Sequence, residues 1–180
     1  MGLKKQHEPF RYALSPAAGG RWHRRGHPWG IDGRTVKLWP GGDLDVSMIT
    51  MSDPLKKVLQ KARLKGQIRC GFEAIFDKLE SERKGIANVR ERKDGPYGDR
   101  VSRLLLFSND GAERFYRHIE HLLQAHALRL LGCLLDINGS ALGNVITGKD
   151  KMIKLVMAEH KDVVAEILRT IVAEHDSRLR

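Results

Sequence analysis

The chain has 180 residues, 41% of them hydrophobic and 30% charged, and its formal net charge is +10 at pH 7. This length and composition suit one globular domain with extensions and argue against a fully disordered chain. No apolar run approaches the length of a membrane span, and the N-terminus lacks the apolar stretch of a secretory signal, so neither class is expected. A chain this basic attracts polyanions, with nucleic acid as the leading candidate, although scattered surface lysines would give the same charge.

The cysteines and the N-terminal charges bear on the compartment. Cys70 and Cys133 lie in unrelated patterns and cannot make a disulfide framework, which fits a reducing intracellular environment. Residues 1–31 hold six basic side chains and one acidic one, a balance compatible with mitochondrial import, while their Gly and Pro content weakens a helical targeting segment. We expect an intracellular protein, and we prefer the mitochondrion to the cytosol.

Residues 1–46 differ from the rest of the chain. They carry all three tryptophans among Arg, His, Gly and Pro, with no period long enough to build a core. We interpret them as a long irregular basic extension that a partner orders, because Arg and Trp can contact phosphates and stack on unpaired bases. In the alternative, the tryptophans cover the domain's own surface. The residues of the extension expected to bind RNA are Arg21, Trp22, Arg24 and Arg25.

The segment 55–70 holds six basic side chains and no acidic one. Its first apolar residues recur at the i, i+3, i+4, i+7 spacing of a buried helix face, which predicts a helix over about 52–65 with a cationic exposed surface. Gly66 suits the left-handed end of this helix, and Gly71 opens a second apolar helical pattern. A packed helix that still displays positive charge is the strongest indication of a polyanionic partner.

Apolar strands and helical periods alternate through the rest of the chain. The stretch 82–100 is charged and contains Gly and Pro, so it reads as a loop or inserted excursion. Ser140 is expected to cap a short helix. Alternation of this kind predicts an α/β fold, a three-layer α/β/α sandwich with a small mixed sheet, over residues 47–176, with a tail at 177–180. The expected strands are 67–69, 101–107, 128–137 and 152–158, and the expected later helices are 71–82, 112–126, 140–146 and 161–174.

One stretch superficially satisfies the glycine spacing of a phosphate-binding loop, Gly143 to Lys149. Such a loop must follow a strand and lead into a helix, whereas this one follows a helical turn and leads into a strand. Asp150 also stands where a magnesium-binding Ser or Thr is required. We therefore expect no nucleotide site here.

Candidate metal and catalytic groups are weak. His118 and His121 lie three residues apart, but no further ligand nearby completes a tetrahedral site. Asp110 and Asp136 follow apolar strands, where helix capping and turn formation explain them. No Ser or Cys has a recognisable nucleophile setting. We expect no catalytic residue, no metal, no cofactor and no small-molecule substrate.

Four short stretches follow one another in the order found in a known RNA-binding family. They are Lys57–Arg63, Arg69–Ala74, Arg103–Asp110 and Ser140–Gly143. Through them, residues 54 to about 168 resemble the superfamily of ribosomal proteins L-seven-Ae, L-thirty-e and S-twelve-e, which implies a small α/β/α sandwich that binds RNA. In that family a glycine begins the second helix and a Leu-Gly pair begins a later helix, both facing the RNA. Gly71 and Leu142 with Gly143 match these positions.

The chain departs from the family after Gly71. Members that recognise kink-turn RNA carry Asn, Glu and Lys there, whereas the matching places hold Glu73, Ala74 and Asp77, with only Lys78 nearby. Acidic side chains at that surface cost affinity for phosphate, which argues against standard kink-turn recognition.

These observations predict a non-catalytic RNA-binding component of a ribonucleoprotein, preferably a mitochondrial ribosomal protein that contacts rRNA and neighbouring subunits. One alternative is a protein-interaction module of the same fold without RNA readout. Another is the RNA-binding subunit of an RNA-processing or RNA-modifying complex. Within the domain, the residues expected to bind RNA are Lys56, Lys57, Lys61, Lys65, Arg69, Gly71, Lys78, Leu142, Gly143 and Lys149.

Overall fold

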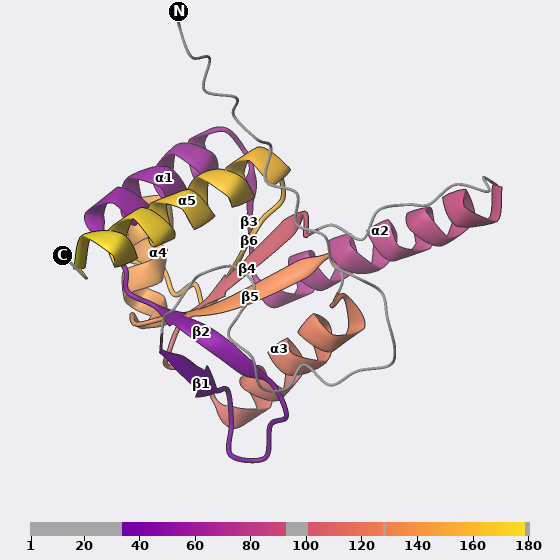
Figure 1. Ribbon diagram of the computed structural model, residues 1–180, viewed down its shortest axis with the longest axis horizontal. Helices are drawn as coiled ribbons and strands as arrows, with labels where there is room; N and C mark the ends of the chain where they lie inside the picture. Colours follow the sequence, from indigo (N-terminus) through magenta and orange to yellow (C-terminus); the bar gives the residue numbers. More distant parts are fainter. Residues whose placement is uncertain (1–33, 93–100, 128, 179–180) are drawn as a thin grey trace, which may run out of the picture.

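The computed structural model describes residues 34–92, 101–127 and 129–178, and within them six strands form one mixed sheet (Figure 1). The strands are β1 (Thr35–Lys37), β2 (Asp45–Ile49), β3 (Ile68–Cys70), β4 (Arg103–Phe107), β5 (Leu130–Leu135) and β6 (Leu155–Ala158). The helices are α1 (Asp53–Leu64), α2 (Phe72–Arg92), α3 (Glu113–Ala125), α4 (Gly139–Thr147) and α5 (Lys161–Arg178). The strand order across the sheet is β1-β2-β5-β4-β6-β3.

Helices cover both faces of this sheet, so the predicted three-layer α/β/α sandwich is confirmed. One face packs against α1, α4 and α5, and the other packs against α2 and α3 (Figure 1). The central strand β4 shows why both faces need a cover: Leu104 and Leu106 point into the first layer, while Leu105 and Phe107 point into the second. All four side chains are fully buried, as expected for a strand between two helical layers.

The strand directions create one distinctive edge of the sheet. β2 and β4 both pair in parallel with β5, and β3 and β4 both pair antiparallel to β6, so β2, β3, β4 and β5 all run the same way. Their last residues, Ile49, Cys70, Phe107 and Leu135, therefore lie along one side, which we call the carboxyl edge. Helices α1, α2, α3 and α4 all begin just beyond this edge.

The predicted N-terminal extension ends too late, because residues 35–49 belong to the sheet. β2 pairs with β5, with Ser47 opposite Cys133, and buries Val46 and Ile49. Two strands of three and five residues are too short to show a convincing period in the sequence. Residues 1–33, which include the four predicted RNA-binding residues Arg21, Trp22, Arg24 and Arg25, lie outside the described residues.

The predicted loop at 82–100 is also wrong at its start, because α2 continues to Arg92. At the predicted end of the helix, Arg83 pairs with Glu80 at 2.7 Å, and Glu82 accepts from Arg103 of β4 at 2.7 Å. Gly85 is exposed within the helix and does not break it. At the other end of the chain, α5 runs to Arg178, beyond the predicted helix end at 174 and domain end at 176.

Local capping follows the expected chemistry with one correction. Ser52 Oγ accepts a hydrogen bond from Leu55 N at 3.2 Å at the start of α1, and Gly66 adopts the predicted left-handed conformation with a φ of 67°. At α4 the cap is Asn138, whose Oδ1 accepts from Ala141 N at 2.8 Å. Ser140, the predicted cap, lies inside the helix instead.

Candidate nucleic-acid interface

The carboxyl edge gathers the N-termini of four helices, each of which presents unpaired backbone N–H groups and a partial positive charge. Gly71 holds the start of α2 in place. Its N–H donates to Leu155 O at 3.0 Å, and its own carbonyl accepts from Ile75 N at 3.2 Å. Its φ of 91° is a backbone conformation that favours glycine. The first turn of α2 is therefore fixed beside the start of β6, with Gly71 exposed.

The loop between α4 and β6 brings lysines to the same place. α4 ends at Gly148, whose φ is 67°, and the loop then doubles back along the helix so that Ile153 N donates to Gly139 O at 2.9 Å. Gly143 permits this close approach, because a Cβ there would lie 1.5 Å from Lys151 O. Lys149 and Lys151 remain exposed on the loop.

Two cations flank the residue that precedes Gly71. Burial raises the pKa of the Cys70 thiol, and the positive charges of Arg63 and Lys151 act against that shift, so both lie within electrostatic range of Cys70. Arg63 reaches this place from the last turn of α1, and Lys151 reaches it from the loop before β6. We call Arg63, Lys149 and Lys151 the basic rim.

Four of the predicted RNA-binding cations are engaged within the protein. The ion pairs are Lys56 with Asp53 at 2.9 Å, Lys61 with Glu166 at 2.9 Å, Arg69 with Glu159, and Lys78 with Glu82 at 3.6 Å. Three other predicted residues, Lys57, Lys65 and Lys149, make no ion pair with any described residue, and the same is true of Arg63 and Lys151. Phosphate can bind these side chains without competing against an internal carboxylate.

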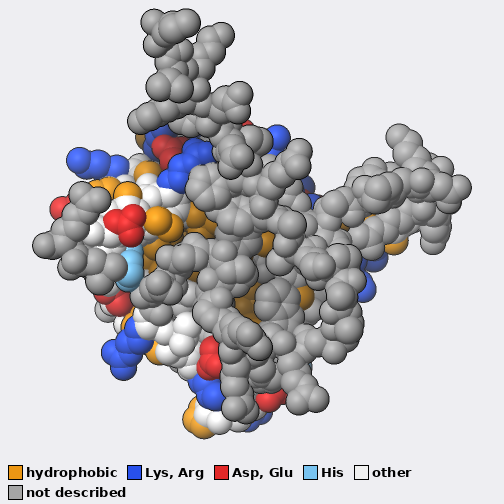
Figure 2. Space-filling model, viewed as in Figure 1, with side chains coloured by type: hydrophobic (Ala, Val, Ile, Leu, Met, Phe, Trp, Pro, Cys, Tyr) orange, Lys and Arg blue, Asp and Glu red, His pale blue; other side chains and the backbone are white. Residues whose placement is uncertain are grey.

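Exposure alone does not single out the cations that can bind phosphate, whereas the absence of an ion-pair partner is a stricter test. Lys and Arg side chains appear at several places around the margin of the face in Figure 2, with Asp and Glu side chains among them. A cation whose neighbour is a carboxylate attracts phosphate less than one that stands alone. Among the described residues, Arg63, Lys149 and Lys151 of the basic rim form no ion pair, as is also true of Lys57 and Lys65, and the exposed Asp150 separates the two loop lysines in sequence.

Leu142 and Gly143, two of the residues predicted to bind RNA, are buried beneath the loop that carries Lys149 and Lys151. The Leu142 side chain is fully buried in the core, and Gly143 is buried against the backbone of Lys151. Their side chains are not presented to a ligand. They support the loop that presents Lys149 and Lys151.

The acidic residues after Gly71 are solvent-facing. Glu73 and Asp77 are both exposed on the first two turns of α2, where α2 turns away from the core side chains Ile75 and Leu79. Phosphate placed directly over this part of α2 would meet their negative charge. The cationic approach to the helix lies instead on the side of Lys151.

Asp110 and Asp136 serve the structure, as expected, but through hydrogen bonds to distant segments and not through the local helix cap and turn that the sequence suggested. Asp110 Oδ1 accepts from Gly139 N at 3.0 Å and from Ser108 Oγ at 2.7 Å, which ties the end of β4 to the start of α4. Burial alone would raise the pKa of Asp110, but these hydrogen bonds and the charge of Lys154 lower it overall. Asp136 Oδ1 accepts from Met51 N at 2.7 Å.

Lys151 is the main residue of the interface that the sequence did not predict. Lys151 is far from Cys70 in the sequence, and only the fold brings it within electrostatic range, since no local pattern links the loop before β6 to the start of α2. Gly143 was the available indication, because a buried glycine inside a helix marks close approach of another backbone.

The described residues contain neither a metal-ligand cluster nor a membrane-spanning helix. Across residues 34–92, 101–127 and 129–178, no group of three or more His, Cys, Asp or Glu is placed to hold a metal ion. Within those ranges, no helix combines the length and apolar character that a membrane span requires.

The chain has a structural similarity to a known protein but no match at the level of sequence families. No family model matches the sequence, and no curated protein matches it. Among solved structures, the chain is similar to the 15.5kD RNA binding protein of Giardia lamblia, with 15% sequence identity and a TM-score of 0.44. The match covers 82% of this chain and 98% of that chain.

Proposed function

We propose that this chain binds RNA without catalysing a reaction, and that the basic rim is its phosphate-binding surface. The observation that carries the proposal is a pair of cations, Arg63 and Lys151, within electrostatic range of Cys70 just before the N-terminus of α2, with the exposed Lys149 on the same loop as Lys151. Helix N-termini and unpaired Lys and Arg side chains both attract phosphate, and the whole chain has a net charge of +10. Lys57, exposed on α1, and Lys65, exposed directly after it, add further positive charge.

The biological setting we propose is a ribonucleoprotein particle, preferably the mitochondrial ribosome, with rRNA and neighbouring subunits as partners. The α/β/α sandwich agrees with the ribosomal superfamily that the sequence resembles, and the Arg- and Trp-containing residues before position 34 suit a protein that extends over RNA. Sedimentation of a cell extract with and without nuclease tests this setting. The chain should co-migrate with ribosomal particles, and its absence from them would reject the ribosomal role.

Salt dependence tests RNA binding itself. The affinity of the full chain for a structured RNA should fall as salt rises, because each phosphate contact releases condensed counterions. Lys149→Glu with Lys151→Glu should weaken binding and reduce the slope of log affinity against log salt by about one for each lost contact. Lys84→Glu is the matched control, since Lys84 is an exposed lysine on α2, about three turns away from its N-terminus. A slope near zero for the unmodified chain would reject RNA binding.

A second candidate is a protein-docking module of the same fold. The specific observation in its favour is the exposed acidic pair, Glu73 and Asp77, at the start of α2. It predicts a partner that stays bound after nuclease treatment and an affinity for RNA that Lys149→Glu and Lys151→Glu leave unchanged.

A further inference from the structure

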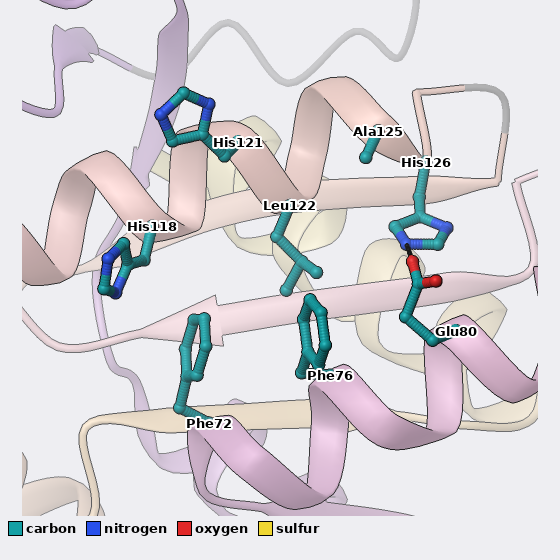
Figure 3. A pocket seen from close by; sticks show the side chains of 8 residues that line it. All are labelled: Phe72, Phe76, Glu80, His118, His121, Leu122, Ala125 and His126. Carbon is teal, nitrogen blue, oxygen red and sulfur yellow. Dashed lines mark ion pairs between the residues drawn. The ribbon is translucent and has the colours of Figure 1, made fainter.

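A groove with an aromatic wall lies between α2 and α3, with a volume of about 350 Å³. Phe72, Phe76 and Glu80 line it from α2, and His118, His121 and Leu122 line it from α3 (Figure 3). We call it the aromatic groove. It begins at the residue directly after Gly71, at the carboxyl edge, and Arg63 and Lys151 of the basic rim lie within electrostatic range of the residue before Gly71.

The two phenylalanines offer flat surface to a ligand. Phe72 and Phe76 lie one helical turn apart and point towards α3, with their ring planes 14° from parallel and their centroids 6.2 Å apart (Figure 3). Phe72 is partly buried and its ring also contacts His118, so Phe76 offers the more accessible ring. The Phe76 residue is 43% exposed, an unusual state for so large an apolar group.

His118 and His126 define the two ends of the groove. His118 packs against Phe72 with centroids 5.6 Å apart and planes tilted by 41°. At the far end, His126 Nε2 lies 3.6 Å from Glu80 Oε1 and closes the groove between the helices (Figure 3). A ligand must therefore enter from the carboxyl edge or from the open side above Phe76.

The charges around the groove favour a neutral planar group over a phosphate. Glu73 and Asp77 are exposed next to the two phenylalanines and repel anions. A nucleobase carries no charge, and it stacks on Phe or His with either face. Arg114 is exposed on α3, one turn before His118, whereas Glu73 and Asp77 are on α2. A positive charge on α3 can neutralise the phosphate backbone of the same nucleotide.

We propose that the aromatic groove binds one unpaired nucleobase of an RNA whose phosphates lie on the basic rim, with the base stacked on Phe76. This inference rests on the proposed function, since it assumes that the chain binds RNA. It adds a preference for RNA with an unpaired nucleotide over a continuous duplex. The competing occupant is an apolar side chain of a protein partner, which the experiment below separates.

The test compares two RNA probes that differ by one nucleotide. One is a blunt duplex, and the other is the same duplex with a single unpaired adenosine, replaced by 2-aminopurine for fluorescence. The full chain should bind the second probe more tightly and quench its fluorescence. Phe76→Ala should lower affinity for that probe about tenfold and leave the blunt duplex unaffected, because stacking on one aromatic side chain is lost.

Two further variants control for folding and for general loss of apolar surface. Phe76→Tyr keeps an aromatic ring and should retain both the preference and the quenching. Leu64→Ala removes a side chain that is 90% exposed on α1 and should change neither affinity. Circular dichroism checks that each variant folds.

The outcomes separate this inference from the proposed function. If Phe76→Ala binds and quenches the bulged probe like the unmodified chain while both probes still bind with a steep salt slope, the base site is rejected and RNA binding stands. If neither probe binds, both proposals fail. If Phe76→Ala instead removes a nuclease-resistant protein partner and leaves the RNA preference intact, the groove is a protein site and the inference is rejected.

Discussion

Trp39 donates its indole N–H to Glu120, and this contact fastens the turn between β1 and β2 to the middle of α3. The Glu120 residue is 5% exposed, and its second carboxylate oxygen accepts from Asp43 N at 2.7 Å and Leu44 N at 2.8 Å. The Arg117 guanidinium lies 4.5 Å from the centre of the Trp39 ring on the other side. Three donors therefore satisfy one buried carboxylate, and Trp39 covers the surface of the domain itself.

Replacement of Glu120 should destabilise the fold strongly. Glu120→Ala leaves the Trp39 indole and two backbone N–H groups without their acceptor, and we expect the free energy of unfolding to fall by about 3 kcal/mol. Urea denaturation followed by Trp fluorescence measures it. Glu113→Ala, which removes an exposed carboxylate of the same helix, should change stability by no more than about 0.5 kcal/mol. Equal effects of the two variants would contradict the assigned role of Glu120.

Two glycines inside helices should respond to alanine in opposite directions. Gly143→Ala places a methyl group on Lys151 O, so we expect a loss of about 2 kcal/mol of stability and a displaced Lys149–Lys151 loop. Gly85→Ala meets nothing within 4 Å and should stabilise the chain by up to about 1 kcal/mol through helix propensity. Thermal unfolding of both variants tests this pair, and a stabilised Gly143→Ala would refute the close approach.

His126 should make unfolding sensitive to mild acid. Burial lowers the pKa of His126 below its ordinary value of 6.5, and the charge of Glu80 only partly opposes that shift. As the pH falls through 6.5, His126 becomes protonated in the unfolded chain while it stays neutral in the folded chain. The free energy of unfolding therefore decreases as the pH drops below 6.5. His126→Gln should remove this component from the pH profile of the free energy of unfolding. The profile of His121→Gln, which alters an exposed histidine of α3, should stay as in the unmodified chain.

The two thiols should differ in reactivity, and one of them should report on RNA. Burial raises the pKa of Cys133 to about 12, and its residue is 1% exposed, so a maleimide should leave it unlabelled until the chain is denatured. Cys70 is only partly buried and should label slowly in the folded chain. Because Cys70 adjoins Gly71 and Lys151, RNA bound at the basic rim should slow that labelling further. Equal labelling rates with and without RNA would place the RNA elsewhere.

The elements with long periods were predictable from the sequence, whereas the short and charged ones were not. The apolar spacing of α1 and the left-handed Gly66 at its end required no tertiary information. β1 and β2 are stabilised by pairing across the sheet to β5, which no local pattern reveals. Glu82, where the predicted helix ended, pairs with Arg103 of β4, a contact that no local pattern reveals.

The candidate site, like the fold, was predictable from the sequence only in part. Positive charge before Gly71 was visible in the sequence, but which cations remain unpaired depended on partners far along the chain, such as Glu166 for Lys61 and Glu159 for Arg69. The aromatic groove was hidden because Phe76 fits the apolar pattern of a core position. Only the packing of α3 beside α2 shows that this ring lies at the surface.

The two edge strands of the sheet are short, and their length affects how readily other chains can pair with the sheet. β1 and β3 stand at its two ends, and each is three residues long. Long unprotected borders recruit strands from other chains and begin aggregates, whereas borders this short offer few free backbone groups. Within the described residues, the sheet therefore offers a strand of another chain little backbone to pair with at either edge.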